Sequence, residues 1–282
     1  MTFEQLTGVR YVVPLREGGS LPAVVDTVQA DGIRPGGPFV VKFLGAGQGA
    51  KALIAEALVA GIAVALGLPV PRPAIVQLAD GFGSAEPDPE IQDLLRGSVG
   101  ENFGLAFLSG ALPFDPSVDR DIASDLAADI VWLDALVTNV DRSARNTNLL
   151  LWHGQLWLID HGAALYVHHR WEGWEGRVQS PFPQIKDHVL LPLAGDLAEA
   201  DARLRPSLTD AVLQTIVDGL PDAWLGGETL FPTLEEHRRA YLTYLSERLN
   251  GPRRWLQEAI DARGRGPERL TVRQTHRLDA DS

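Results

Sequence analysis

The most informative stretch of this sequence reads Asp141-Arg-Ser-Ala-Arg-Asn-Thr-Asn-Leu-Leu-Leu-Trp-His-Gly-Gln-Leu-Trp-Leu-Ile-Asp-His-Gly162. Two apolar runs, 149–152 and 155–159, flank His153-Gly154, which suits the two-residue loop of a β-hairpin. That loop sets the pairing, because residues equally distant from it must face each other. We therefore expect a short antiparallel ribbon whose open end lies beyond residues 149 and 158.

The predicted pairing brings two polar side chains together at the open end of this ribbon. Thr147 would face Asp160, so Asn146 lies one step from that carboxylate. Directly opposed residues have Cβ atoms about 5 Å apart. An amide oxygen and a carboxylate at such a separation can share one hard cation such as Mg²⁺. Asn146 and Asp160 are therefore the predicted metal ligands.

A third polar group belongs to the same stretch. Asp141 lies five residues before Asn146, on the loop that follows a predicted long helix. A carboxylate able to accept a proton, beside two oxygen ligands for Mg²⁺, provides the parts that in-line phosphoryl transfer needs. Catalysis of that reaction depends mainly on positioning and on neutralising charge.

The sequence before this stretch has mainly β character, with one clear helix. Apolar, β-branched runs bounded by Gly- and Pro-containing turns predict strands, and an Ala/Leu/Ile-rich run stopped by Gly67 and Pro69 predicts the helix. The segment 81–100 is polar and rich in Gly and Pro, so we expect a loop there. The expected strands are 9–15, 23–28, 39–44, an extended edge strand at 69–79, and 103–108, with the helix at 48–66.

The sequence around and after the hairpin has mainly helical character. An irregular aromatic-rich segment is expected at 163–192, and the helices are expected at 116–137, 208–219, 234–249 and 252–262. This order predicts an α+β, two-lobed fold with a small β-rich N-lobe and a larger helical C-lobe. The expected divisions are residues 1–108, residues 109–262, and a flexible tail at 263–282.

Composition limits the function classes. The 282 residues are 45% hydrophobic, which is enough for a folded core, and contain no cysteine, which excludes disulfides and thiolate chemistry. A formal net charge of −12 argues against direct nucleic-acid binding. The longest apolar run, 53–68, is interrupted by Glu56 and is shorter than a membrane span. With no signal peptide apparent at the N-terminus, we expect a cytoplasmic protein without a membrane span.

Two charged residues stand out within apolar elements. Lys42 lies in the middle of Phe39-Val-Val-Lys-Phe-Leu44, and Glu56 lies within the apolar helix that follows. An ammonium among apolar residues is costly unless it is paired or faces a cleft. Opposite charges on two such elements predict a shared, partly buried pair. Two surface side chains that extend their charges into water are the alternative.

These motifs resemble those of the HipA-like kinases within the protein-kinase-like superfamily, whose catalytic loop is similar to that of the phosphoinositide lipid kinases. The Asp-Arg-x-x-x-Asn pattern corresponds to Asp141–Asn146, and the Asp-Phe-Gly position reads Asp160-His161-Gly162. The resemblance implies an ATP- and Mg²⁺-dependent kinase in which Asp141 is the catalytic aspartate and Asn146 and Asp160 hold Mg²⁺. It further implies that Lys42 contacts the ATP phosphates and that Glu56 is its ion-pair partner.

The resemblance also has implications for the adenine and phosphate contacts and for the acceptor. Backbone groups of Ala106, Phe107 and Leu108 are expected to pair with adenine. No clear G-x-G-x-x-G precedes Lys42, and Gly18, Gly19 and Ser20 are the candidate phosphate-covering loop. An ordinary glycine turn is equally compatible with them. His161 replaces the usual Phe. The implied acceptor is a hydroxyl, with Ser/Thr of a protein favoured over a small molecule or a lipid.

Two other functions stay open at this level. Gly45-Ala-Gly-Gln-Gly-Ala-Lys51 follows a predicted strand and opens a helix, and it partly fits a dinucleotide-binding fingerprint, although no ribose-binding acid follows about 20 residues later. A dinucleotide-dependent oxidoreductase is therefore one alternative. A nucleotide-binding pseudokinase without catalysis is the other.

Overall fold

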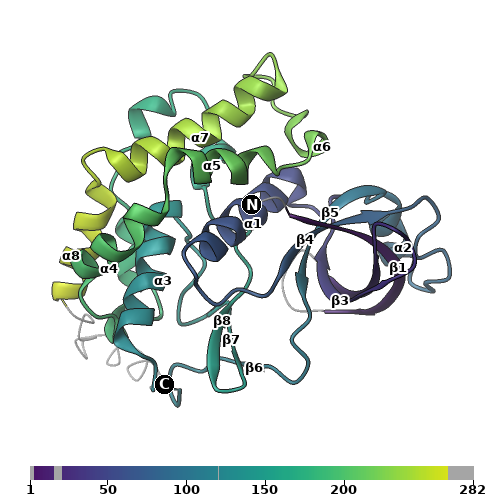
Figure 1. The fold of residues 1–282 in the computed structure, drawn as a ribbon, viewed down its shortest axis with the longest axis horizontal. Helices are drawn as coiled ribbons and strands as arrows, with labels where there is room; N and C mark the ends of the chain where they lie inside the picture. Colours follow the sequence, from purple (N-terminus) through teal and green to yellow (C-terminus); the bar gives the residue numbers. More distant parts are fainter. Residues whose placement is uncertain (1–2, 16–20, 120, 266–282) are drawn as a thin grey trace, which may run out of the picture.

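The computed structural model describes residues 3–15, 21–119 and 121–265, and its N-terminal part is a β-barrel (Figure 1). The barrel is closed in the order β1-β2-β3-β5-β4, through a parallel pairing of β1 with β4 and antiparallel pairings elsewhere. The strands are β1 (Glu4–Pro14), β2 (Ala23–Gln29), β3 (Pro35–Lys42), β4 (Pro73–Leu78) and β5 (Gly100–Ala106). The α+β fold with a β-rich N-terminal part is confirmed.

Two expectations for this part were wrong in detail. β4 is not an edge strand, because it pairs with both β1 and β5. Pro73 is its first residue, and the two earlier prolines precede the strand, so no proline interrupts the pairing. The expected loop at 81–100 contains helix α2 (Pro89–Arg96). Asp88 caps its N-terminus by accepting a hydrogen bond from the backbone N–H of Glu90.

Helix α1 (Gly49–Ala65) lies between the barrel and the helical part of the chain (Figure 1). Every residue from Ala52 to Ala63 is buried, because β4 and β5 contact the helix on one side and helices of the C-terminal part contact it on the other. Its residues belong to the same apolar core as the C-terminal helices, whereas the barrel interior forms a second core. The division at residue 108 stays a prediction, and α1 connects the two parts through one core.

The C-terminal part is mainly helical, as expected. Its longer helices are α3 (Ser124–Val137), α5 (Asp210–Asp218), α7 (Leu234–Asn250) and α8 (Arg254–Arg265), and two short helices that the apolar pattern did not indicate are α4 (Leu197–Leu204) and α6 (Asp222–Leu225). Single 3₁₀ turns occupy much of 163–192, in agreement with an irregular segment.

Helix α3 begins eight residues later than expected from the apolar pattern. The segment before it forms local side-chain turns instead: Asp115 accepts hydrogen bonds from the N–H and hydroxyl of Ser117, and Asp119 accepts one from the N–H of Asp115. Such bonds compete with helix formation for backbone donors.

The predicted hairpin is present. β7 (Leu149–Trp152) pairs with β8 (Gln155–Leu158), with Leu149 opposite Leu158 and Trp152 opposite Gln155. His153 and Gly154 both have positive φ, 49° and 75°, as a tight turn that matches the strand twist requires. The two-residue strand β6 (Leu112–Pro113) pairs with the outer side of β7.

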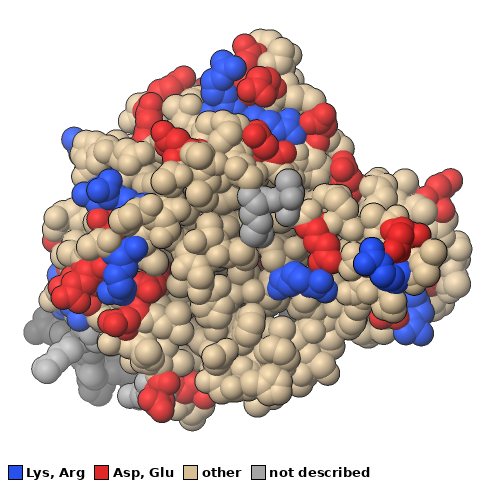
Figure 2. Space-filling view, in the orientation of Figure 1, with Lys and Arg blue, Asp and Glu red and all other residues tan. Residues whose placement is uncertain are grey.

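Charged side chains are interspersed over the face shown in Figure 2, with no broad basic surface on it. No helix among the described residues is both long enough and apolar enough to cross a bilayer.

Candidate active site

An ionic cluster joins the barrel, α1 and the end of the hairpin. The Lys42 ammonium donates to the carboxylates of both Glu56 and Asp160, so the predicted pair of Lys42 with Glu56 exists and has a third member. The Glu56 side chain is fully buried and that of Lys42 is 13% exposed, whereas 43% of the Asp160 side chain is accessible. The cluster is therefore closed on the Glu56 side and open to solvent at Asp160.

Burial and charge act against each other in this cluster. Burial disfavours the charged form of Lys42, but the two carboxylates outweigh it and hold the Lys42 pKa above its ordinary value. Burial likewise opposes ionisation of Asp160, but the Lys42 ammonium lowers the Asp160 pKa below its usual value. For Glu56 burial is the larger effect and raises the pKa. Asp160 is consequently ionised at neutral pH and available to a cation.

The backbone positions each member of the cluster. Lys42 is the last residue of β3, Glu56 lies in the buried middle of α1, and Asp160 follows β8 with φ of 53°. Gly162 lies between the two carboxylates: a Cβ there would stand 3.3 Å from Glu56 Oε1 and 3.8 Å from Asp160 Oδ1. A side chain at 162 would crowd Glu56 and would touch Asp160 only at ordinary contact distance, so glycine eases the close packing against Glu56.

The catalytic-loop candidates are joined by hydrogen bonds. Asn146 Nδ2 donates to Asp141 Oδ2 at 2.8 Å, and Asn148 Nδ2 donates to the Asp141 backbone carbonyl at 2.9 Å. The Ile159 N–H donates to the Asn148 carbonyl at 3.1 Å, so the predicted hairpin pairing continues one step beyond β7 and β8, toward Asn146 and Asp160. The shared-cation assignment of these last two residues stays a prediction.

The donor set fits a hard divalent cation. Because Asn146 uses its amide nitrogen on Asp141, its amide oxygen is left for another partner. Asp160 offers a half-exposed carboxylate, and oxygen ligands of these two types suit Mg²⁺. No group of three or more His, Asp or Glu side chains suited to a metal occurs among the described residues, so the cation would keep waters or phosphate oxygens as further ligands.

A buried polar network supports this loop from below, and sequence reasoning missed it. The Arg142 guanidinium pairs with Asp134 of α3 and donates to the Asn148 carbonyl. His188 Nε2 lies 2.9 Å from the same Asp134 carboxylate. Burial opposes ionisation of Asp134, but Arg142 and His188 outweigh it and lower its pKa far below the usual range. An aspartate in the apolar run Ile130–Val137 was the signal for this network.

His161, at the position where a Phe is usual, belongs to the same network. Arg142 Nη2 lies 3.2 Å from His161 Nδ1, and because a guanidinium can only donate, Nδ1 must be the acceptor. Burial, reinforced by the positive charge of Arg142, lowers the His161 pKa to about 3. His161 is therefore a neutral, buried ring at physiological pH.

The remaining predicted contacts are the phosphate-covering loop and the adenine-binding segment. Gly18, Gly19 and Ser20 lie outside the described residues. The N–H of Ala106 donates to the Arg72 carbonyl and the N–H of Phe107 to the Pro38 carbonyl, each at 2.9 Å. Neither amide is therefore available to adenine in this arrangement.

Two comparisons with known proteins found matches to this chain. The family model described as HipA-like kinase matches residues 34–233, well over half of the chain. The chain belongs to the HipA-like kinase family. The crystal structure of a Helicobacter pylori proinflammatory kinase, CtkA, is similar in fold: its TM-score is 0.54 at 14% sequence identity, covering 91% of this chain and 97% of that chain. No curated protein matched.

As a HipA-like kinase, the protein is a phosphotransferase, and the family implies the use of ATP and a metal. The matched range contains all three members of the ionic cluster and the whole hairpin. A dinucleotide-binding fold is not supported: β3, which precedes Gly45–Lys51, pairs antiparallel with β2 and β5 in a barrel, whereas that fold needs a parallel sheet.

Proposed function

We propose that this HipA-like kinase transfers the γ-phosphate of ATP to a hydroxyl acceptor, with Ser or Thr of a protein favoured. The observation that carries the proposal is the ionic cluster of Lys42, Glu56 and Asp160, beside a loop on which Asp141 and Asn146 are hydrogen-bonded to each other. Such an arrangement supplies the cation, the metal ligands and the proton acceptor that phosphoryl transfer uses.

Asn146 and Asp160 would hold Mg²⁺, which when bound supplies positive charge against the phosphate oxygens. Lys42 braces the phosphates. Glu56, which is fully buried and cannot turn to solvent, keeps the Lys42 ammonium in place. This division of roles gives each member of the ionic cluster one task.

Asp141 orients and deprotonates the acceptor. Its Oδ2 accepts from Asn146, and Oδ1 has no partner among the residues that the structure describes. That oxygen can accept the proton of an acceptor hydroxyl as the oxygen attacks the phosphate. Arg142 is the positioning residue for this loop, because its bonds to Asp134 and to the Asn148 carbonyl fix the backbone on either side of Asn146.

Adenine is proposed to bind against the segment Ala106–Leu108. Since the amides of Ala106 and Phe107 are engaged, Leu108 is the member whose amide has no partner among the described residues. Gly18, Gly19 and Ser20 stay the proposed phosphate-covering loop.

The test is the Asp141→Asn variant. It should bind Mg·ATP with an affinity within about threefold of wild type and lose at least 10²-fold in phosphate transfer, because only the proton acceptor is removed. Calorimetry measures the binding, and mass spectrometry after incubation with Mg·ATP and cell lysate finds the transferred phosphate. Asp80→Asn, an exposed aspartate after β4, is the matched control. Unchanged transfer by Asp141→Asn would remove Asp141 from its role.

A further inference from the structure

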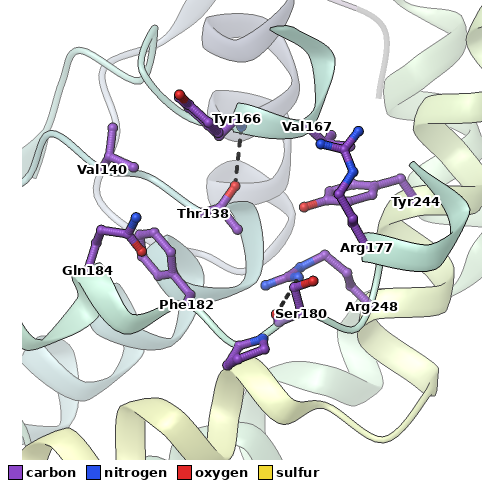
Figure 3. A pocket seen from close by; sticks show the side chains of 11 residues that line it. Thr138, Val140, Tyr166, Val167, Arg177, Ser180, Phe182, Gln184, Tyr244 and Arg248 are labelled. Carbon is purple, nitrogen blue, oxygen red and sulfur yellow. Dashed lines mark hydrogen bonds between the residues drawn. The ribbon is translucent and has the colours of Figure 1, made fainter. Parts of the chain in front are cut away.

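A cavity of about 180 Å³ opens beside the catalytic loop (Figure 3). Its walls come from the loop after α3, the 3₁₀ turn Tyr166–His169, the segment 177–184 and helix α7. Val140 lines it and directly precedes Asp141, so the cavity begins within one residue, about 3.8 Å along the chain, of the proposed proton acceptor. The cavity wall is therefore continuous along the chain with the loop that carries Asp141.

The residues that line this cavity carry a net positive charge, although the protein as a whole is negatively charged. The chain carries 37 acidic against 25 basic residues, yet none of the eleven lining residues is acidic and two are arginines. Among the described residues neither Arg177 nor Arg248 has a carboxylate partner. The cavity therefore has a local excess of positive charge.

Arg248 is a buried guanidinium whose hydrogen-bond partners, within the part of the chain that the structure describes, are all backbone carbonyls. It is 1% exposed and donates to the carbonyls of Ala135, Leu136 and Val178 while lying over the Tyr244 ring. Carbonyl dipoles orient such a charge but do not cancel it, so its field extends into the cavity. In Figure 3 the Tyr244 hydroxyl and the Arg248 guanidinium turn toward the same space.

Arg177 is half-buried and retains free donors. One of its terminal nitrogens donates to the carbonyls of Arg170 and Glu172, and its Nε and other terminal nitrogen have no partner among the described residues. The polar neighbours Ser180, Gln184 and Tyr244 can each donate a hydrogen bond as well. Donors without acceptors, around a cavity with two cations, are the complement of an oxyanion.

We infer that this cavity binds an anionic group of the phosphate acceptor, a carboxylate or a phosphoryl group close to the hydroxyl that is phosphorylated. The link to the acceptor rests on the proposed function, whereas the anion site rests on the cavity alone. Because the molecule as a whole is negative, long-range attraction does not bring an anion here. At physiological salt, charges more than about 8 Å away are screened, so nearby charges count most. There the two lining arginines oppose the negative charge of Asp141.

Peptides with a central serine test this inference on the full chain. Each peptide carries one substitution at one position beside the serine. At every such position four peptides are made, with Glu, phosphoserine, Gln or Lys. We measure kcat/KM for transfer from Mg·ATP, and equilibrium binding by fluorescence anisotropy with a non-hydrolysable ATP analogue. At one position Glu or phosphoserine should exceed Gln at least tenfold in both measurements. The ratio of Glu to phosphoserine tells a carboxylate site from a phosphoryl site.

Two variants should reduce this preference to less than threefold. Gln184→Glu places a negative charge in the cavity on an exposed side chain, and Arg177→Gln removes a positive charge. Arg239→Gln, which removes a charge from an exposed arginine on α7 that does not line the cavity, should keep the preference. Gln184→Glu carries the test if Arg177→Gln fails to fold.

The outcomes separate the two proposals. If wild type phosphorylates or binds all four peptides equally, or the preference survives in both variants, the inference is overturned while the kinase proposal stands. If no peptide receives phosphate but anionic peptides bind with a preference that both variants lose, the anion site is supported and a protein acceptor is not. Absence of any peptide binding overturns the inference.

Discussion

At the scale of single residues, the site depends on charges that are held where water cannot solvate them well. Lys42 is 13% exposed and lies between two carboxylates, so its ammonium is fixed before any nucleotide arrives. A preorganised charge of this kind is worth much more to a transition state than a mobile surface charge, because little reorganisation is needed.

Lys42→Met should therefore lower kcat/KM for phosphate transfer by about 10²–10³-fold, roughly 3–4 kcal/mol of transition-state stabilisation. Methionine keeps most of the packing volume, and Glu56, whose pKa burial already raises, can become protonated when its partner is removed. Lys51→Met is the control, because Lys51 pairs with Glu228 outside the cluster and should change kcat/KM less than twofold. Equal losses in both variants would contradict the assignment.

His161 predicts a pH dependence of stability. Its folded pKa of about 3 lies below the ordinary 6.5, so between these values the unfolded chain binds more protons than the folded one. The free energy of unfolding therefore falls as the pH falls through this window. For His161 alone the loss from pH 7 to pH 5 is about 2 kcal/mol.

His161→Phe should remove that share of the pH dependence. Urea unfolding at pH 7 and pH 5 should show a difference smaller by about 2 kcal/mol than in wild type. Other buried histidines, such as His188, also have lowered pKa values, so they account for the pH dependence of stability that remains in the variant. The same pH difference in wild type and variant would show that His161 does not ionise on unfolding.

At the scale of elements, the hairpin sets the position of the proposed catalytic groups. The turn at His153-Gly154 determines which residues of β7 and β8 face each other, and thereby where Asp160 emerges. Asp160 itself has positive φ, an arrangement that Asp tolerates better than most residues. The local backbone thus directs this side chain out of the ribbon.

Gly154→Ala should destabilise the protein by about 1 kcal/mol. No atom of the described residues outside the turn lies within 4 Å of the added Cβ, so the cost comes from φ of 75°, which L-residues disfavour. Gly226→Ala is the matched control, since Gly226 is also open but has φ of −73°. Thermal unfolding measures both, and a loss in Gly226→Ala as large as in Gly154→Ala would refute the backbone explanation.

At the scale of the whole molecule, α1 connects the barrel to the helical part. Its buried residues share one core with the C-terminal helices, and Glu56 on this helix contacts Lys42 of the barrel. A ligand that contacts both Lys42 and Asp160 therefore binds to the barrel and to the helical part at the same time. Such binding to the folded state alone must raise its stability.

Mg·ATP at a hundred times its Kd should raise the free energy of unfolding by about 2.7 kcal/mol. Asp160→Ala should weaken this Mg²⁺-dependent effect, because a proposed Mg²⁺ ligand is removed. Thermal unfolding with ATP, with and without EDTA, measures the metal-dependent part, and ADP with Mg²⁺ is the ligand control. The same metal-dependent stabilisation in wild type and Asp160→Ala would refute the ligand assignment.

The sequence by itself determined the features that depend on near neighbours in the chain. The hairpin followed from a two-residue turn between apolar runs, since pairing across such a turn has only one register. The α+β order of elements followed from local periodicity. Lys42 and Glu56 were predicted as partners because a charge inside an apolar element needs one.

Only the tertiary structure decided what brings distant segments together. Lys42 and Asp160 are 118 positions apart, and no local pattern links them. Closure of the barrel through β1 and β4 gave β4 two neighbours where the sequence indicated an edge. Asp134 paired with Arg142 and His188 beneath the catalytic loop. Burial of charge is a property of the packed molecule, because a carboxylate meets its partners only when helix, loop and strand have excluded the water between them.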